Sequence, residues 1–561
     1  MEKGTDNPIT SVYFYTKDND TDCFPSTTSK KTSLFLPETF QEEILRVYSK
    51  NDEKIEILKK ETTECLRQVE LYSVNDSATK QEHREILPAE TALYQDCDTS
   101  NIFEVLYERE QVPPFNDDRT VLSEDNCQQI LNDSIHGIIT LHPLLFKIID
   151  TPQFQRLRNI KQLGGCYFVY PGASHNRFEH SIGTCYLASK LANQLQSKLD
   201  EDINKLKKEN KDYSRLQKAV MTAKDKLCIE IAALCHDLGV CNPNRFLQHE
   251  DVSRKMFDHM IQSNDSLKKE FDKIFKVKDL KFIKDLINGE VTEDDPQQKS
   301  SEVVEDDSQQ YKKYMFEIVA DKQNSIDVDK MDYFARDCHG LGMSSNFNHL
   351  RFISQCRIMF PFKDSNQTTI AVRDKEELNL YELFHTRNGL FRRAYQHPVT
   401  HGIQLIGEVK MSKAFDDMYA YEKLTDSVLD VILMSRNEGL NKSKDLIHRI
   451  YNRQLYKVVG IDRKEAKKIR RRLTKNDKQF GKDDFNLQTL RFSYGKDSRN
   501  PIKFVYFYKK DSDECLEGKD PDKTSLFLPS VNFQEEIILL YSTCIDDEKT
   551  NCIRRKWDEI Q

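Results

Sequence analysis

The feature that most constrains this chain is an adjacent histidine and aspartate at the end of an apolar segment. Residues 229–234 are mostly apolar and lead into Leu234-Cys-His-Asp-Leu-Gly239, a pattern that predicts a buried helix ending before Gly239. A buried imidazole beside a buried carboxylate is costly unless another group compensates them. The sequence therefore predicts that His236 and Asp237 bind a compensating group, and a metal ion is the simplest one.

Two further segments supply the other ligands that such a site needs. Upstream lies Ser174-His-Asn-Arg-Phe-Glu-His-Ser181, and downstream lies Ile326-Asp-Val-Asp-Lys330. Neutral imidazoles and carboxylates suit iron, zinc or manganese, and a site with open positions can activate water. An isolated His-Asp pair is more often structural, but the order H…HD…D in these surroundings favours a metal site. One further ligand would then come from each of the two flanking segments.

Several longer runs resemble a single protein family. They are Asp133-Ser-Ile-His-Gly137, Asp150-Thr-Pro-Gln-Phe-Gln-Arg-Leu-Arg158, Tyr170 to His180, Asp327-Val-Asp-Lys330 and His385-Thr-Arg-Asn388. In these runs the chain resembles the metazoan SAM-and-HD-domain deoxynucleoside triphosphate triphosphohydrolases, from roughly Gln128 to Tyr541. The resemblance implies a mainly α fold. It also implies an HD-domain helical core and a smaller α+β C-terminal lobe. In the core, the resemblance implies that His180, His236, Asp237 and Asp329 hold the metal.

The two ends of the chain contain an internal repeat. Asn7 to Tyr15 returns as Asn500 to Tyr508, Thr32 to Pro37 as Thr524 to Pro529, and Phe40 to Ile44 as Phe533 to Ile537. Each copy predicts a strand, a turn-rich linker and an amphipathic helix. Two interpretations of the N-terminal copy are open: a duplicated oligomerisation element, and a gene-fusion remnant or gene-model artefact.

Together these patterns predict four parts. Residues 1–55 are a partial duplicate of the C-terminal lobe, 56–127 a poorly defined polar linker, 128–455 the HD phosphohydrolase core and 456–561 the C-terminal lobe. The SAM domain of many family members is not visible at the N-terminus.

Composition limits the location and the partners. No apolar run reaches the ~18 residues of a membrane span, and no signal peptide opens the chain, so we expect an intracellular protein of the nucleus or cytoplasm that binds no membrane. The 14 cysteines form no CxxC pair, which is typical of reduced thiols. The net charge of −8 gives no global field for nucleic acid. A local basic run, Lys464 to Lys475, is open to two interpretations, a solvated face or a contact for phosphate or single-stranded nucleic acid.

The resemblance implies an activity, the hydrolysis of dNTPs to deoxynucleosides and triphosphate. Such an enzyme lowers cellular dNTP pools, a role linked to antiviral defence and innate immunity. The reaction needs activated water, cations for the triphosphate and an acid for the departing 5′-oxygen. Gln162 and Asp337 match residues that hold the 3′-hydroxyl, and Leu163 and Tyr395 match those that exclude a ribose 2′-hydroxyl. The full set of matched substrate residues is Gln162, Leu163, Arg177, Lys330, Tyr333, Asp337, Arg387, Tyr395 and Gln396.

The acid is where the chain departs from the family. After Gly239 the family continues with a histidine-containing segment that includes the acid, whereas this chain is shorter and rejoins the family at His249. Phe391 also replaces a family histidine. The matched catalytic residues that remain are His249, Arg177 and Asp337. Three hypotheses follow: a regulated dNTP triphosphohydrolase, a catalytically impaired nucleotide-binding paralogue, and a single-stranded nucleic-acid binder or nuclease.

The resemblance also implies regulation. In the family, GTP or dGTP and a second dNTP, with Mg²⁺, bind between subunits and drive assembly of a homotetramer. Asp150, Gln155 and Arg158 match the guanine-nucleotide site. The neighbouring site is matched by Asn132, Phe178, Arg357, Arg373, Lys375 and Asn379, while Pro398 replaces a family lysine.

Overall fold

The computed structural model divides the chain into two units, residues 1–127 and 128–561. It describes residues 13–16, 19–25, 129–240, 249–291, 310–362, 366–406, 417–463, 466–473, 480–481, 483–496, 499–509, 514–517 and 534–560. For residues 13–25, 249 and 466–468 the description covers the backbone alone. The predicted linker over 56–127 lies outside the described residues.

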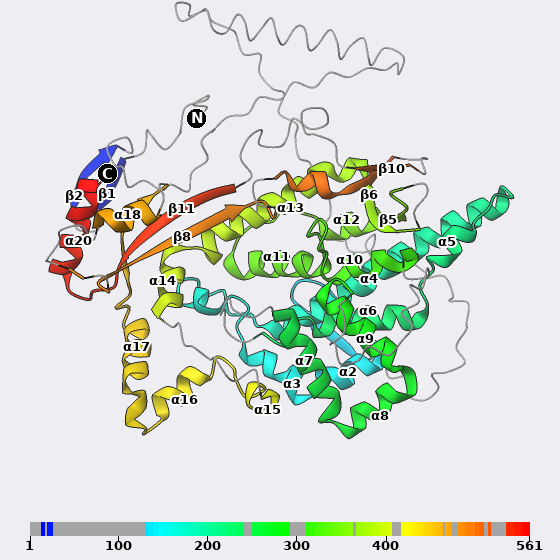
Figure 1. Cartoon of the computed structure of the whole chain (residues 1–561), viewed down its shortest axis with the longest axis horizontal. Helices are drawn as coiled ribbons and strands as arrows, with labels where there is room; N and C mark the ends of the chain where they lie inside the picture. Colours follow the sequence, from blue (N-terminus) through cyan, green and yellow to red (C-terminus); the bar gives the residue numbers. More distant parts are fainter. Residues whose placement is uncertain are drawn as a thin grey trace, which may run out of the picture. The chain divides into compact units, whose positions relative to one another are not determined.

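Helices dominate the second unit, so the predicted mainly α fold is confirmed (Figure 1). Its centre is α4 (Arg177–Lys208), against which α6 (Ala223–Cys235) and α11 (Val328–Leu341) pack. The other α-helices are α2 (Pro143–Ile149), α3 (Pro152–Gln155), α5 (Ser214–Lys218), α7 (His249–Gln262), α8 (Asp265–Ile274), α9 (Val277–Asn288), α10 (Phe316–Val319), α12 (His349–Ser354), α13 (Glu377–Leu390), α14 (Pro398–Ile406), α15 (Met418–Tyr421), α16 (Val428–Met434), α17 (Asn441–Tyr451), α18 (Ala466–Leu473) and α20 (Asp547–Ile560). Short 3₁₀ segments are η5 (Arg156–Asn159), η6 (Gly164–Phe168), η8 (Gln310–Met315), η9 (Asp374–Glu376), η12 (Glu438–Leu440) and η13 (Pro501–Phe504). Among the described residues, no helix is both long and apolar enough to cross a bilayer.

The central helix α4 is longer than the sequence predicted. Leu187, Leu191 and Leu195, spaced by four residues, predict a helix from Gly183 to Leu199, and the structure extends it in both directions. At its start the Glu179 carboxylate accepts a hydrogen bond from the backbone N–H of Asn176 at 2.9 Å, which satisfies one of the unpaired donors of a helix N-terminus. Apolar side chains repeat every four residues along its buried face and hold it against the core. They include Leu187, Leu191, Leu195 and Leu199.

The helix α6 ends where the sequence predicted, and His236 and Asp237 lie in the turn that follows. At its start the Thr222 hydroxyl accepts a hydrogen bond from the N–H of Asp225 at 3.1 Å. Gly239 is required after the turn because a Cβ there would lie 2.2 Å from the backbone nitrogen of Ser253 on α7. The chain can therefore pass close to α7 directly after the two metal-ligand candidates.

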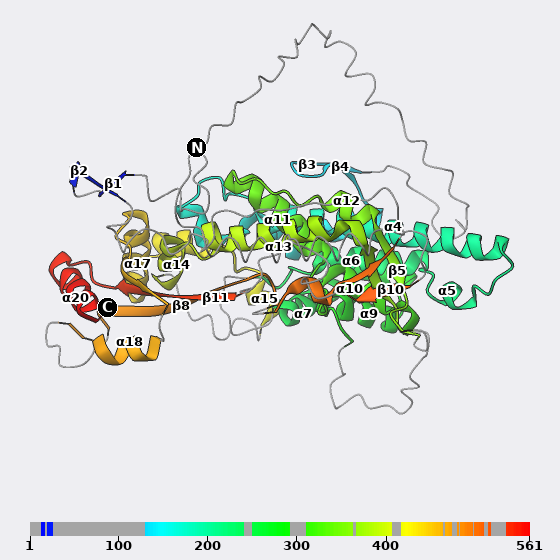
Figure 2. The ribbon, with the colours of Figure 1, turned by 90° about the horizontal axis from the view of Figure 1, so that it is seen from above.

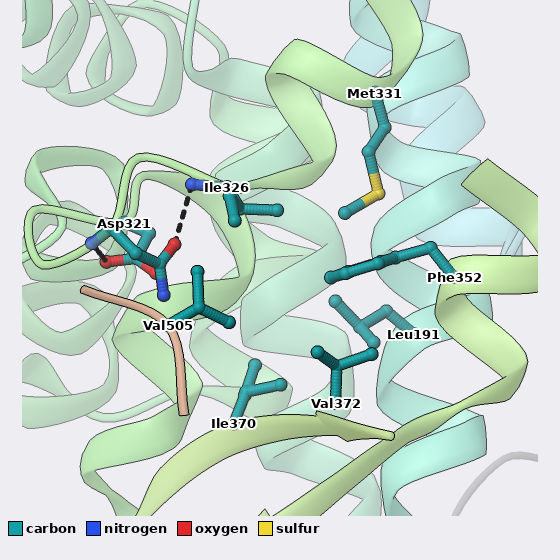
Figure 3. A pocket seen from close by; sticks show the side chains of 9 residues that line it. Leu191, Asp321, Ile326, Met331, Phe352, Ile370, Val372 and Val505 are labelled. Atoms are coloured by element: carbon teal, nitrogen blue, oxygen red, sulfur yellow. Dashed lines mark hydrogen bonds between the residues drawn. The ribbon is translucent and has the colours of Figure 1, made fainter. Parts of the chain in front are cut away.

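A four-stranded sheet joins the helical core to a distant part of the chain. Its strands lie in the order β10 (Cys515–Glu517), β9 (Tyr506–Tyr508), β6 (Thr369–Arg373), β5 (Cys356–Met359). Neighbours are antiparallel except β6 and β9, which are parallel. Beside this sheet is a small, mostly apolar cavity of ≈ 20 Å³, and Val505 and Ile370 are among the residues that line it (Figure 3). It holds no more than a water-sized group.

A second sheet forms the α+β part near the C-terminus, at the opposite end of the unit from α5 (Figures 1 and 2). The antiparallel strands lie in the order β7 (Lys457–Asp462), β11 (Gln534–Ser542), β8 (Phe485–Ser493). Helices α18 and α20 cover it through one apolar cluster. That cluster includes Val459, Ile469, Leu473, Phe485, Ile538, Leu540, Ile553 and Trp557.

The helix predicted over Phe533 to Ile537 is wrong, because Gln534 onward belongs to the central strand β11. The segment Gln-Glu-Glu resembles the first turn of a helix, but the following residues from Ile537 to Ser542 are buried consecutively. Ile538 and Leu540 pack against α18 and α20, and Tyr541 contacts Pro398 and Gly402 of α14. Both faces of the strand are therefore covered, which suits this unbroken apolar run. Tertiary pairing has overridden the local pattern.

The repeated segments form equivalent hairpins. In the first unit β1 (Tyr13–Thr16) pairs with β2 (Asn19–Pro25), with Phe14 opposite Phe24. In the second unit β9 pairs with β10, with Phe507 opposite Leu516. Tyr13–Phe14 and Tyr506–Phe507 are the corresponding residues of the repeat, so the sequence duplication is also a duplication of local structure.

Candidate metal centre and substrate pocket

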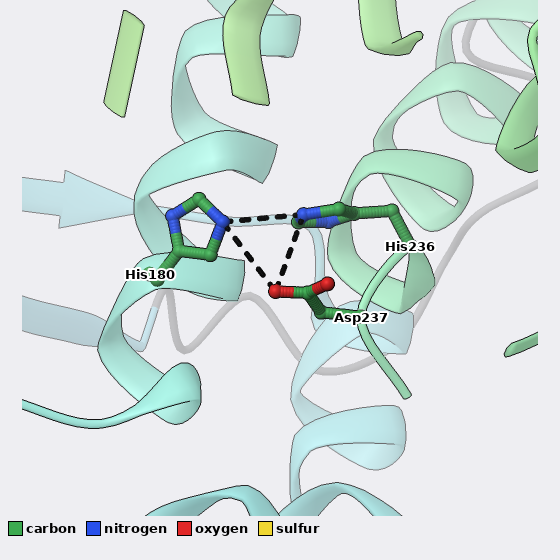
Figure 4. A group of neighbouring side chains, drawn as sticks. All are labelled: His180, His236 and Asp237. Carbon is green, nitrogen blue, oxygen red and sulfur yellow. Dashed lines mark hydrogen bonds and ion pairs between the residues drawn. The ribbon is translucent and has the colours of Figure 1, made fainter. Parts of the chain in front are cut away.

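The four predicted metal ligands meet between three helices. His180 lies in the first turn of α4, His236 and Asp237 follow α6, and Asp329 lies in the first turn of α11. The two Nε2 atoms of His180 and His236 are 3.2 Å apart. Asp329 Oδ1 lies 3.0 Å from the His180 Nε2 and 3.3 Å from the His236 Nε2. Asp237 Oδ2 lies 3.6 Å from each of the same two nitrogens, and Figure 4 shows this convergence.

In each histidine, one ring nitrogen donates a hydrogen bond to the protein, and this leaves the lone pair of the other nitrogen free to bind a metal. His236 Nδ1 donates to the carbonyl oxygen of Ala233 at 2.8 Å, and His180 Nδ1 donates to Asp332 Oδ2 at 2.7 Å. In the neutral rings both Nε2 lone pairs therefore face each other and two carboxylates. They repel one another unless positive charge lies between them. This donor set fits a divalent transition metal.

The charges of the centre favour a cation. Burial opposes a charged imidazole, yet hydrogen bonds to Asp329 and Asp332 raise the pKa of His180 to about 10. Burial also opposes ionisation of Asp329, but its hydrogen bonds with His180 and His236 keep the pKa of this carboxyl well below its usual range. The carboxylates thus remain ionised in a buried site, where they stabilise positive charge.

Arg177 is tied directly to the metal ligands. Its NH1 group donates to Asp237 Oδ2 at 2.6 Å, and its NH2 group donates to the carbonyl oxygen of Gln162 at 3.3 Å. Burial disfavours the Asp237 carboxylate, but the Arg177 guanidinium lowers its pKa below the usual range. The predicted phosphate-binding arginine therefore lies at the edge of the metal centre.

A pocket of ≈ 280 Å³ opens beside the centre, and His236, Asp329 and Lys330 are among its lining residues. Lys330 Nζ donates to Asp327 Oδ2 at 2.8 Å. Burial disfavours the ammonium, but the nearby Asp327 raises the pKa of Lys330, which stays charged. Tyr333 lies close by, with its ring centroid 6.1 Å from that of His180. The pocket thus places a fixed positive charge next to cation ligands, as a polyphosphate requires.

The predicted sugar-binding residues also lie together. Asp337 accepts hydrogen bonds from the Tyr395 hydroxyl and, at 2.6 Å, from His175 Nε2. Leu163 and Tyr395 pack into one small apolar cluster. The side-chain oxygen of Gln162 is buried and has no hydrogen-bond partner among the described residues. Asp337 was expected to bind the 3′-hydroxyl of the sugar, but both its carboxylate oxygens already accept a hydrogen bond from the protein. A sugar hydroxyl would have to donate to the remaining lone pairs of these oxygens.

Phe391 contacts the two residues that lie one helical turn to either side. The guanidinium carbon of Arg387 is 4.2 Å from the Phe391 ring centroid, and the Tyr395 ring is 5.1 Å away edge to face. Arg387 NH1 donates to the carbonyl oxygen of Ser493 on β8. The amphipathic pattern predicts one helix from Asn379 to Tyr395, whereas α13 ends at Leu390 and Phe391–Tyr395 is a π-helical turn, η10. Such turns commonly occur at functional sites because they redirect side chains. Gln396, the next residue, has a buried side-chain oxygen with no hydrogen-bond partner in the part of the chain that the structure describes.

Comparisons with known proteins agree with this arrangement. An HD domain matches residues 177–337, the span that holds all four metal-ligand candidates. The deoxynucleoside triphosphate triphosphohydrolase SAMHD1 of Xenopus laevis is 37% identical over 487 residues, which cover 77% of this chain and 73% of that protein. Human SAMHD1 is 37% identical over 487 residues, with 78% and 74% covered. This chain belongs to the SAMHD1 family. A SAMHD1 homologue of Dictyostelium discoideum is 32% identical over 475 residues, covering 79% of this chain and 82% of that protein.

The predicted departure from the family begins after Gly239, and two side chains hold the backbone at that point. Arg156 NH2 donates to the carbonyl oxygen of Val240 at 2.8 Å, and the Tyr421 hydroxyl donates to that of Gly239 at 2.7 Å. The guanidinium carbon of Arg156 lies 5.2 Å from the Tyr421 ring centroid. The start of the shortened connection is therefore held from two sides. His249 begins α7, and its side chain lies outside the description.

Several residues matched to the family's regulatory sites lie together beside η5. Arg158 Nε donates to Gln155 Oε1 at 2.8 Å, and its guanidinium carbon lies 3.5 Å from the Phe178 ring centroid. Asp150 ends α2 nearby in the chain. The other matched residues lie on β3 (Ile130–Asp133), β5, β6, η9 and α13. They are Asn132, Arg357, Arg373, Lys375 and Asn379.

Sequence reasoning missed the residues behind the metal ligands, Asp332, Arg336 and His136. Asp332 accepts a hydrogen bond from the metal-ligand candidate His180, and Arg336 and His136 contact Asp332 in turn. One signal was available, because Asp329, Asp332 and Arg336 are spaced by three and four residues and so share a face of α11. The pairing with His136, 196 positions away, has no local signal.

Proposed function

We propose that this chain is a metal-dependent dNTP triphosphohydrolase that converts a dNTP and water into a deoxynucleoside and triphosphate. The observation that carries the proposal is the two-histidine, two-carboxylate cluster beside a pocket lined by Lys330. The relatives that bear this activity in their names support the same function.

Each part of the site has a proposed role. An iron, zinc or manganese ion held by His180, His236, Asp237 and Asp329 supplies Lewis-acid activation of water. Arg177 and Lys330 provide fixed positive charge for the triphosphate, and Arg387 and Tyr333 extend this surface. Gln162, Asp337 and Gln396 bind the sugar side. Leu163 and Tyr395 fill the space that a ribose 2′-hydroxyl needs, which favours deoxynucleotides.

The proton for the departing 5′-oxygen is assigned to His249. The chain is shortened in the segment where the family carries its acid, and His249 is the matched histidine that begins α7. Its neighbour Glu250 lines the pocket, so the start of α7 lies at the site. The second candidate function is a nucleotide-binding paralogue with impaired catalysis, and the same shortened segment favours it.

The test is dNTP hydrolysis by the full chain, with Asp329→Ala as the inactive control. If the acid is weak or missing, we expect triphosphate release to be about 10²–10⁴-fold slower than in a SAMHD1 with the full segment. A p-nitrophenyl phosphodiester needs no proton on its leaving group, so its hydrolysis should suffer much less. Adding a histidine-containing family segment between Gly239 and Gln248 should then restore dNTP hydrolysis.

Full dNTP turnover that is lost in His249→Gln would instead assign the acid to His249 and remove the impaired-paralogue reading. A chain that binds metal but neither binds nor hydrolyses dNTPs would contradict both.

We further propose regulation by GTP or dGTP and a second dNTP, with Mg²⁺, in a homotetramer that lowers dNTP pools in the nucleus or cytoplasm. The contact between Arg158 and Phe178 supports it, since it unites residues matched to both nucleotide sites.

A weaker single-stranded nucleic-acid contact is proposed at α18, where Arg470 and Arg471 are exposed. Arg472 NH1 donates to the carbonyl oxygen of Ile560, so part of this basic run has a structural role.

A further inference from the structure

Asp332 is the most heavily engaged carboxylate behind the metal ligands. It is fully buried. It accepts hydrogen bonds from His180 Nδ1 at 2.7 Å, from His136 Nε2 at 2.6 Å, and from the Nε and NH2 groups of Arg336, both at 2.9 Å. A carboxylate with four donors is fixed in position. It therefore fixes the ring of His180, whose other nitrogen faces the metal centre.

The network continues to the surface. Arg336 NH1 donates to Asp133 Oδ2 at 3.0 Å. Asp133 Oδ1 in turn accepts hydrogen bonds from the backbone N–H groups of Ile135 and His136, both at 2.9 Å. These residues form the turn between β3 and β4 (Gly137–Thr140), which pair as a hairpin. The turn thus supplies two of the partners, Asp133 and His136, that hold Asp332 and Arg336 in place.

The packing leaves no freedom in this network. Gly183 lies directly beneath it on α4, and a Cβ there would lie 2.0 Å from Asp332 Oδ1 and 2.5 Å from the Arg336 NH2 atom. The His136 ring is enclosed by Tyr186 and His349, with centroids 5.4 Å and 5.6 Å away. A displacement of the hairpin turn must therefore break hydrogen bonds rather than be absorbed by loose packing.

The hairpin is also a surface element. Ile130 is 64% exposed and Ile138 is 70% exposed. Ile138 lies directly opposite Asn132, a residue matched to a regulatory nucleotide position. One short element thus has an exposed outer face and an inner turn that is hydrogen-bonded, through Asp332, to a metal ligand.

We propose that Asp332 is a positioning residue that couples the β3–β4 hairpin to His180, so that ordering of the hairpin and metal binding strengthen each other. From the proposed function the inference takes only the metal centre. It adds a route by which binding of a ligand at Asn132 affects that centre. Coupling of this kind is reciprocal, because each event must favour the other by the same factor.

The test uses the full chain, Mn²⁺ as the probe, and two isosteric variants. Asp332→Asn should weaken Mn²⁺ binding by about 10–100-fold, the usual effect of losing a partner behind a metal ligand, and should alter the Mn²⁺ electron paramagnetic resonance spectrum. Asp133→Asn keeps the Oδ1 acceptor of the turn but removes the charge that Arg336 contacts, so we expect a smaller loss in the same direction. The matched control is Asp212→Asn, an exposed turn aspartate whose Oδ1 likewise accepts a backbone N–H, from Ser214.

A second readout tests the reciprocal direction. Mn²⁺ should slow hydrogen exchange of the β3–β4 amides in the wild type, and this slowing should be lost in Asp133→Asn but kept in Asp212→Asn. If Asp332→Asn does not fold, Asp133→Asn still decides the question. Unchanged Mn²⁺ affinity in Asp133→Asn, or hairpin exchange that ignores Mn²⁺, overturns the coupling even if dNTPs are hydrolysed. Coupling without dNTP hydrolysis overturns the proposed function alone.

Discussion

The ring of His180 is held at both nitrogens, by Asp332 on one side and by the metal centre on the other. Removing one ligand of such a centre leaves the remaining charges buried without their counter-charge, which costs several kcal/mol per ion. Ligand loss should therefore show first in metal content and second in stability.

We expect Asp329→Ala to lose the tightly bound metal, because its carboxylate lies nearer to both histidine nitrogens, at 3.0 and 3.3 Å, than that of Asp237, at 3.6 Å. Elemental analysis should find about one iron, zinc or manganese per wild-type chain and far less in the variant. Asp327→Asn, two residues away and bonded to Lys330 rather than to a histidine, is the control and should keep the metal. A wild-type chain without metal would contradict the site.

Asp321 should make stability depend on pH. Burial and, to a lesser degree, the Asp327 carboxylate raise its pKa to about 6, against hydrogen bonds from the N–H groups of Asn324 and Gln323. The groups that face it include Glu317 and Lys330 as well. A raised carboxyl pKa favours the folded state at low pH, and this contribution is lost as pH rises from about 4 through about 6.

Asp321→Asn keeps the Oδ1 acceptor and removes the charge. We expect it to be up to about 3 kcal/mol more stable than the wild type at pH 8, since one pKa unit corresponds to about 1.4 kcal/mol. Urea unfolding at pH 5 and pH 8 checks this, and the difference should shrink at pH 5. An equal difference at both values would show that the gain has another origin.

At this scale the meeting of the four predicted metal ligands could be expected from the sequence, whereas the role of Asp332 could not. His180, His236, Asp237 and Asp329 follow a family pattern that fixes chemistry and order. The role of Asp332 depends on which helix faces it, and His136 comes from a hairpin that is remote in sequence. A carboxylate on a helix face is usually solvated, so its type and spacing alone do not indicate four buried partners.

At the scale of elements, the connection from α6 to α7 is held at its start by Arg156. Arg156 makes three hydrogen bonds to carbonyl oxygens there and nearby, those of Leu238, Val240 and Leu424. It comes from η5, beside Arg158 of the matched regulatory group. The shortened connection is therefore anchored to the element that carries that group.

We expect Arg156→Met to lower the free energy of unfolding by about 2–4 kcal/mol, because buried carbonyl acceptors would lose a charged donor. The variant should therefore unfold at a lower urea concentration than the wild type. Tyr421→Phe removes one hydroxyl bond to Gly239 and should cost about 1 kcal/mol. If both variants unfold like the wild type, the connection is not held by these contacts.

The element scale also contains the clearest failure of sequence reading. Helices α4 and α6 were predicted because their apolar spacing and caps agree with their tertiary surroundings. The helix expected from Phe533 was wrong because the segment Gln-Glu-Glu has helical character. The strand β11 is instead stabilised by pairing with β7 and β8. The partners of Ile538 on these two strands lie about 75 and 49 residues earlier in the sequence. Pairing at that range leaves no trace in a short window.

At the scale of the whole molecule, the end of the chain completes a sheet that the core begins. Strand β6 of the core lies between β5 and β9 in the four-stranded sheet. In the chain, β9 comes directly after β8, which belongs to the C-terminal sheet. The four-part division, with its boundary at 455/456, stays a prediction, and the parallel pairing of β6 with β9 crosses that boundary.

We expect GTP with a dNTP to shift the chain toward a tetramer in sedimentation velocity, and Asp150→Ala to need at least about tenfold more GTP for the same shift, since a carboxylate paired to a guanine edge is worth roughly 1.4 kcal/mol or more. Asp212→Ala, at an exposed turn, is the control. A wild-type chain that stays a monomer with both nucleotides would contradict the regulatory proposal.

The buried network of Asp332, Arg336 and Asp133 has a consequence for stability. Buried charges of this kind are often less stabilising than apolar side chains of the same volume. Folding alone would therefore be served equally well by apolar side chains packed over Gly183. What the network adds is a fixed ring orientation for His180, which a metal site needs and ordinary helix packing does not.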